Sequence, residues 1–87
     1  MKIEITRQFV KDLKILPQKI QKSVAEVYTN IEKANSIREI LNCKKLEGST
    51  HYYRIRVGNY RILFLVTISG DTVILKRVVP RGGAYHK

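Results

Sequence analysis

Two strand-like runs joined by Gly58-Asn59 constrain the fold of this chain more than any other feature. Residues 52–57 (YYRIRV) alternate between core-forming and polar side chains, and residues 60–67 (YRILFLVT) continue with residues typical of strands. A two-residue Gly-Asn connection favours the tight turn of a β-hairpin. If these two residues alone form the turn, the pairing register is fixed, and Arg56 lies directly opposite Arg61.

This register gives the hairpin two different faces. One face is apolar or aromatic and is expected to meet helices; it contains Tyr53, Ile55, Val57, Tyr60, Ile62 and Phe64. The other face contains Arg54, Arg56 and Arg61, with no acidic residue in the hairpin. Like charges opposite each other on antiparallel strands are destabilising, by up to roughly 1 kcal/mol. An anion between the guanidinium groups would relieve the repulsion, so we predict an anion-binding surface; simple solvation of the arginines is the alternative.

The residues before the hairpin predict one strand and two helices. Residues 2–6 alternate around two isoleucines as a short strand does. Thr6 can cap the following helix, whose apolar residues have helical spacing: Phe9, Val10, Leu13 and Leu16. Pro17 ends that helix and suits the first turn of a second one, with an apolar stripe of Ile20, Val24, Val27, Tyr28 and Ile31.

The rest of the chain completes one small domain, residues 1–87. We expect a helical turn at residues 36–41, a polar connector at 44–49, a second hairpin turn at 69–71, and a third strand over 72–79 that ends at Pro80. If the second turn has three residues, Arg77 joins the arginine face next to Leu63. The order β-α-α-β-β-β predicts an α+β fold, with a helical hairpin packed on one face of a mainly antiparallel sheet.

Composition narrows the function further. The formal net charge is +10, and residues 50–87 contain seven basic side chains against the single acidic residue Asp71. Five of these seven are arginines, whose planar forks match phosphate oxygens, so a polyanionic partner is expected. The single cysteine, Cys43, forms no internal disulfide, and with two histidines it makes no zinc site, so neither a metal nor another cofactor is predicted. No apolar run spans a membrane and no signal peptide is evident, so we expect a cytoplasmic protein.

The polyanionic partner can be nucleic acid, an acidic protein, or both in turn, and other residues extend the predicted anion-binding surface. Lys44 and Lys45 are expected either to contact phosphate non-specifically or to contact nothing, and Tyr52 either stacks on a base or packs. Tyr85 and His86, near the end of the chain, either belong to a frayed tail or fold over the arginine face, where they could transfer protons.

Three sequence stretches resemble the RelE/ParE superfamily of type II toxin–antitoxin toxins: L-E-G-S-T-H-Y-Y-R-I-R-V-G-N-Y-R-I-L-F, the strand ending V-V-P-R, and the closing A-Y. The resemblance covers nearly the whole chain and implies a RelE-like fold. For the RelE-like branch it implies a ribosome-dependent endonuclease that cleaves mRNA in the A site without metal, through attack of a ribose 2′-hydroxyl on the neighbouring phosphate. The site residues it implies are Arg54, Arg56, Arg61, Arg81 and Tyr85.

The resemblance leaves alternatives open. ParE-like members share the fold but inhibit DNA gyrase, and a non-catalytic basic RNA-binding module is a third class. Arginine hardly deprotonates, so the general base is not assigned, and His86 is an alternative. Pro80 and the glycines before Ala84 depart from the commoner ending of the family. The implied partners are the ribosome with its mRNA, an acidic and partly disordered antitoxin, and operator DNA only through the antitoxin complex.

Overall fold

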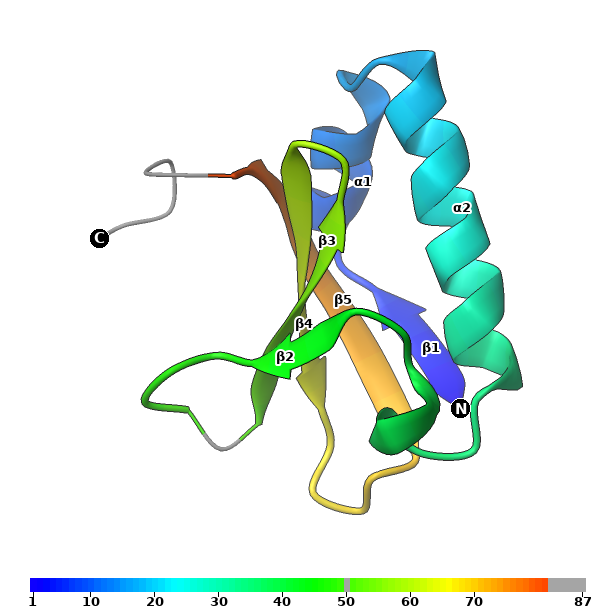
Figure 1. Ribbon diagram of the computed structural model, residues 1–87, viewed down its shortest axis with the longest axis vertical. Helices are drawn as coiled ribbons and strands as arrows, with labels where there is room; N and C mark the ends of the chain where they lie inside the picture. The colour runs from blue at the N-terminus through cyan, green and yellow to red at the C-terminus, as the bar shows by residue number, and fades with distance from the viewer. Residues whose placement is uncertain (50, 82–87) are drawn as a thin grey trace.

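The computed structural model describes residues 1–49 and 51–81. Over these residues the protein forms a five-stranded mixed sheet with two helices on one of its faces (Figure 1). Its elements are β1 (Lys2–Ile5), α1 (Arg7–Lys14), α2 (Gln18–Lys33), the 3₁₀ turn η1 (Ile37–Glu39), β2 (Cys43–Lys45), β3 (Tyr52–Val57), β4 (Tyr60–Val66) and β5 (Thr72–Pro80). The strand order is β1-β5-β4-β3-β2, with β1 parallel to β5 and the other pairs antiparallel. The predicted α+β class is confirmed, and the predicted strands and helices occur in the predicted order, with β2 added before the central hairpin. No helix in the described residues is long and apolar enough to cross a membrane.

The two helices begin and pack largely as predicted. The Thr6 side chain caps α1 by accepting a hydrogen bond from the Phe9 backbone N–H at 3.1 Å. In α2, Val24 and Ile31 are buried, and the other stripe residues pack against them. Val10 was expected on the buried stripe of α1, but it is 40% exposed. That expectation was wrong because α1 turns Phe9 and Asp12 toward β5, and Val10 then lies about 100° around the helix from Phe9.

The predicted polar connector contains a strand. Cys43–Lys45 form β2 and pair with the outer edge of β3, where Lys44 lies opposite Arg54 and Lys45 opposite Tyr53. Three residues are too few to show alternation, and two adjacent lysines are typical of exposed edges rather than of strand interiors. The sheet therefore has one more strand than the sequence predicted.

The register of the central hairpin is confirmed at every pair from Tyr52–Leu65 to Val57–Tyr60, including Arg56 opposite Arg61. The face toward the helices forms the core together with residues from β5, and its most deeply buried side chains are Ile31, Ile55, Ile62, Phe64, Val73 and Leu75. Tyr53 stacks on Phe64, with ring centroids 5.6 Å apart. The hairpin thus presents one face to the core, and within residues 1–49 and 51–81 no helix covers its opposite face (Figure 1).

The pairing of β4 with β5 differs from the expected register along half of its length. Val66 pairs with Val73, Leu65 with Ile74, and Phe64 with Leu75, as a turn longer than three residues requires. A β-bulge then leaves Lys76 as the extra residue, and Leu63 pairs with Arg77. The predicted neighbourhood of Leu63 and Arg77 is therefore found, but the bulge produces it, and not the turn.

Candidate nucleic-acid interface

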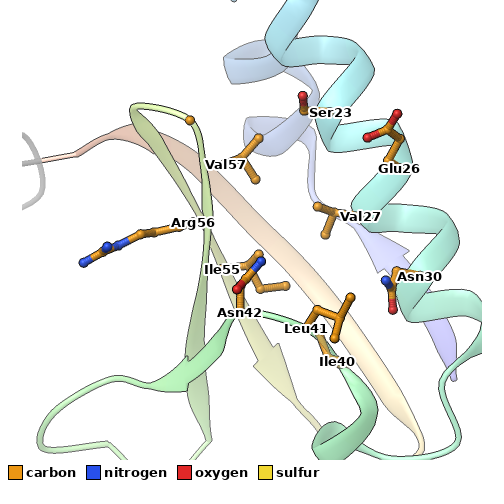
Figure 2. Close-up of a pocket in the computed structure, with 11 residues that line it drawn as sticks. Ser23, Glu26, Val27, Asn30, Ile40, Leu41, Asn42, Ile55, Arg56 and Val57 are labelled. Carbon is orange, nitrogen blue, oxygen red and sulfur yellow. The ribbon is translucent and has the colours of Figure 1, made fainter.

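Strand alternation separates the arginines of β3 from its core residues. Ile55 and Val57 point toward α2 and line a cavity of about 310 Å³ with it, whereas Arg56 points away from the helices (Figure 2). Arg54 and Arg56 therefore lie on the open face of the sheet, and Arg61 joins them from β4. We call this set, together with Lys44 of β2, the basic face.

The edge of the basic face next to β2 contains a shallow hollow. It has a volume of about 290 Å³ and is lined by Lys44, Arg54 and Arg56 together with Ile40, Asn42 and Cys43. Because Lys44 pairs with Arg54, both side chains lie on the open face, whereas Lys45 belongs to the opposite one. The structure therefore brings only one of the two predicted lysines to the arginines.

Arg81 reaches the site from the end of β5. Pro80 pairs with Tyr60, and the backbone N–H of Arg81 then donates to the Asn59 carbonyl oxygen at 2.7 Å. This bond holds Arg81 beside the β3–β4 turn. Arg81 directly follows Val79 and Pro80, which pair with Arg61 and Tyr60. Three chain segments therefore converge at this end of the basic face: β3, β4 and the end of β5.

Arg77 has a specific protein partner. Its Cα pairs with Leu63, but its Nε and Nη2 atoms donate to the carboxylate of Asp12 in α1 at 3.0 and 3.1 Å. Burial alone raises the pKa of Asp12, but hydrogen bonds from Arg77, Gln8 and the Val78 N–H outweigh burial and lower that pKa below its ordinary value. The hydrogen bonds with Asp12 in turn raise the pKa of Arg77. The carboxylate is charged at neutral pH, and the guanidinium fork of Arg77 is held by it.

The lower half of the open face is apolar, which the sequence analysis did not single out. Leu63 and Leu65 of β4 are half-buried there, as is Ile74 of β5. Tyr52, at the start of β3, pairs with Leu65 and is 41% exposed. The alternation of β4 contained this information, because its apolar residues occupy both faces. The open face therefore joins a cationic half to an apolar half.

The remaining candidate residues add little to this geometry. Tyr85 and His86 lie outside the described residues. Cys43 packs against the core, and its burial raises the pKa of its thiol to about 11. Among residues 1–49 and 51–81, no three histidine, cysteine, aspartate or glutamate side chains gather where they could hold a metal ion.

The basic face has the chemistry of a phosphate site. Guanidinium groups on adjacent strands offer several N–H donors in fixed planes, and they keep their charge at any physiological pH. The core behind them fixes the strands from which these arginines project, so their spacing along the sheet is set by the register. Such a site can bind a nucleic-acid backbone and stabilise the charge that develops on a phosphate during its transfer.

Comparison with known proteins places this chain in a class of toxins. Residues 3–85 match the sequence model of the family described as "ParE toxin of type II toxin-antitoxin system, parDE". The chain therefore belongs to the ParE toxin family, within the RelE/ParE superfamily that its motifs resemble.

Particular relatives carry the RelE name. Toxin RelE3 of Methanocaldococcus jannaschii is 42% identical over 86 residues, which cover 98% of this chain and 96% of that protein. The fold is similar to the crystal structure of a RelB-RelE antitoxin-toxin complex from Methanococcus jannaschii, with a TM-score of 0.77, 42% identity and 88% of each chain covered. It is also similar to an archaeal RelE-RelB complex from Pyrococcus horikoshii, with a TM-score of 0.77, 30% identity, and 95% and 97% of the two chains covered.

Proposed function

We propose that this toxin is a metal-independent endoribonuclease that cleaves mRNA in the A site of the ribosome. One observation carries the proposal: Arg56 lies opposite Arg61 on an open sheet face, with Arg54 beside them and Arg81 at the adjacent strand end. The guanidinium groups of these neighbouring arginines repel one another, and an anion bound between them would relieve that repulsion. An RNA phosphate has the concentrated negative charge that such a site requires.

In the proposed reaction the ribose 2′-oxygen attacks the adjacent phosphorus atom. A new P–O2′ bond forms, the P–O5′ bond breaks, and the products are a 2′,3′-cyclic phosphate and a 5′-hydroxyl. The proton of the 2′-hydroxyl leaves during attack, and the 5′-oxygen gains a proton as it departs. The protein has to align the three reacting atoms and neutralise the charge on the non-bridging oxygens.

We assign Arg61 and Arg81 to the scissile phosphate and Arg54 or Arg56 to the flanking backbone. Tyr85 orients a base by stacking or shuttles a proton, and His86 is the alternative proton acceptor because an arginine hardly deprotonates. Lys44 and Tyr52 extend the binding surface along the same face. Lys45 and Arg77 contribute only weakly to RNA binding in this scheme, since Lys45 faces the other way and Arg77 is paired with Asp12.

We further propose that a cognate antitoxin neutralises the toxin by covering the basic face. The crystal structures of the archaeal relatives contain RelB with RelE, which supports a partner of this kind. An acidic segment that is partly disordered when free would pair with the arginines and bury apolar residues against Leu63, Leu65 and Ile74. Operator DNA would then be contacted through the antitoxin.

The test uses purified protein with ribosomes programmed with a defined mRNA. We expect cuts within the A-site codon. Arg61→Ala or Arg81→Ala should lower the cleavage rate at least about 100-fold, because each removes a positive charge that stabilises the negative charge of the transition state. Arg38→Ala, an exposed arginine of η1 outside the basic face, is the matched control and should cleave like the wild type. Unchanged thermal unfolding temperatures establish that the variants are folded.

The second candidate function is inhibition of DNA gyrase, which the ParE name of the matching family favours. If the protein leaves mRNA on ribosomes intact but stops gyrase-driven supercoiling, this second function replaces the first. If neither assay responds while RNA binding remains and weakens with salt, the protein is a binding module without catalysis.

A further inference from the structure

The outer edge of β5 is held by more than its partner strand. β1 pairs with β5 only from Lys2–Thr72 to Ile5–Leu75 and then ends. Thr6 continues the hydrogen bonding, because its backbone N–H donates to the Leu75 carbonyl oxygen at 3.1 Å and its hydroxyl donates to the Lys76 carbonyl oxygen at 2.9 Å. The residue that caps α1 therefore also holds β5 at the start of the bulge.

Asp12 binds the outer edge of β5 beyond the residues that Thr6 contacts. Its Oδ2 atom accepts a hydrogen bond from the backbone N–H of Val78 at 2.9 Å, three residues beyond the last β1 pair. Val78 is 4% exposed, so this donor needs a protein partner in place of water. A side chain from α1 thus occupies the position that the next strand residue would fill in a longer β1.

The carboxylate of Asp12 is itself held firmly. Arg77 binds both carboxylate oxygens through Nε and Nη2, and the Nε2 of Gln8, one turn earlier in α1, donates to Oδ1 at 2.9 Å. Only 7% of Asp12 is exposed, and Arg77 supplies the opposite charge that burial of a carboxylate requires. These contacts join α1 to residues 77 and 78 of β5. We call the group the clamp; its members are Gln8, Asp12, Arg77 and the backbone N–H of Val78.

The position of the clamp matters because of the bulge. Lys76 is the extra residue between the Leu75–Phe64 and Arg77–Leu63 pairs, and a bulge bends and twists the strand that contains it. Thr6 bonds to the bulge residue, and Asp12 bonds to the strand two residues later. The residues of β5 that follow the clamp contact the basic face and the adjacent turn. Val79 pairs with Arg61, Pro80 pairs with Tyr60, and the Arg81 N–H donates to the Asn59 carbonyl oxygen.

We propose that Asp12 is a positioning residue for the basic face, because its clamp fixes the bulge of β5 and thereby holds Arg81 beside Arg61. Arg77 is assigned to this clamp and away from the substrate. The predicted effect of Asp12 on mRNA cleavage rests on the function proposed above. Its predicted effect on the position of Arg81 is independent of that function.

The first measurement is amide hydrogen exchange in the full chain, followed by NMR. Asp12→Ala should accelerate exchange of the Val78 and Arg81 N–H groups at least about tenfold, because the strand end loses its outer partner. Asp12→Asn keeps oxygen and loses charge, so it should give an intermediate acceleration, and it replaces the alanine variant if that variant does not fold. Asp71→Ala, which removes a carboxylate at the other end of β5, is the matched control and should leave the Arg81 amide unchanged.

The second measurement separates positioning from general stability. In the ribosome assay, Asp12→Ala should lower kcat at least about tenfold with little change in KM, because Lys44, Arg54 and Arg56 still bind the substrate. Phe9→Leu, a core change in the same helix, provides a variant of lowered stability that should retain kcat.

Unchanged exchange at Arg81 in Asp12→Ala would overturn the proposal, as would an equal loss of kcat in Phe9→Leu. If the wild type does not cleave mRNA, the proposed function fails, and the exchange measurement alone then decides whether Asp12 positions Arg81.

Discussion

At the scale of single residues, Arg56 and Arg61 form an unfavourable cross-strand pair but place two arginines side by side on the open face of the sheet. They are directly opposite each other on antiparallel strands, where like charges repel, yet the core on the other face of the same strands holds the hairpin together. The repulsion is small compared with the burial of Ile55 and Ile62, each of which contributes roughly 1.5–3 kcal/mol. The fold can therefore sustain a charge arrangement that serves binding and not stability.

Replacing one arginine of the pair should stabilise the fold and weaken the site. We expect Arg56→Thr to raise the free energy of unfolding by up to about 1 kcal/mol at low salt, since it removes the like charge and adds a β-branched residue. The gain should shrink at high salt because exposed charges are then screened. Urea denaturation at two ionic strengths measures both effects, with Arg38→Thr as the control outside the sheet. Equal stability of the wild type and Arg56→Thr at low salt would contradict the argument.

The thiol of Cys43 should react slowly. Burial raises its pKa from 9.0 to about 11, so at pH 8 its thiolate fraction is about 100-fold smaller than that of an ordinary thiol. Alkylation by iodoacetamide should therefore be slow at pH 8, and its rate should reach half of its maximum only near pH 11. The urea-unfolded chain is the control, and its rate should reach half of its maximum near pH 9. A midpoint near pH 9 in the folded protein would show that burial does not protect the thiol.

At the scale of elements, the β3–β4 turn and the start of α2 are fitted to each other. Gly58 has a φ of 58°, in the left-handed region, and a Cβ built at this residue would lie 3.1 Å from Cδ1 of Ile20. The glycine therefore meets two separate requirements. One is a backbone conformation that other residues rarely adopt, and the other is space for the helix that covers the turn.

Gly58→Ala should lower the free energy of unfolding by about 1–2 kcal/mol, because the alanine pays for the left-handed conformation and also displaces Ile20. Gly70→Ala is a matched control: Gly70 has a φ of 79° and nothing within 4 Å of an added Cβ, so it reports the backbone cost alone. Adding Ile20→Val to Gly58→Ala should recover part of the difference. Thermal unfolding of the four proteins tests this, and equal losses at the two glycines would exclude the contact with Ile20.

The elements also show which features a sequence reveals. The β3–β4 hairpin was predictable because successive side chains alternate between faces and Gly58-Asn59 fixes the turn. β2 was not, since three residues show no period. The bulge left a trace that was overlooked: the buried positions of β5 change from Val73 and Leu75 to Val78, so their spacing changes from even to odd across Lys76. The role of Asp12 depends on contacts 65 and 66 residues away, which no local pattern contains.

At the scale of the whole molecule, the sheet separates two kinds of basic surface. The lysines of α2 belong to the helical layer, and the arginines of β3 and β4 belong to the open face of the sheet. Figure 1 shows α1 and α2 together on one side of the sheet. Net charge attracts a polyanion to the whole protein, but the open side groups the planar donors of Arg54, Arg56 and Arg61 on two adjacent strands.

RNA binding should therefore depend on the open side. For a single-stranded 2′-O-methyl RNA oligonucleotide, which cannot be cleaved, each lost phosphate contact reduces the slope of log K against log salt by about 0.7. The double variant Arg54→Gln/Arg56→Gln should reduce the slope by about 1.4. Lys19→Gln/Lys22→Gln removes the same charge from α2 and should leave the slope unchanged. Fluorescence anisotropy over a salt series measures both, and equal changes in the two variants would assign binding to net charge alone.

The alternation of core and site residues along β3 has a consequence for how the gene can change. Point substitutions can alter Arg54 or Arg56 without touching Ile55 or Val57, so activity and folding can be lost or gained separately. In-frame loss of one codon within residues 52–57 exchanges the two sets, because it rotates every later side chain of the strand to the other face. Such a deletion removes the toxin's core and its site in one event, whereas a length change in residues 67–71, between β4 and β5, spares both strands.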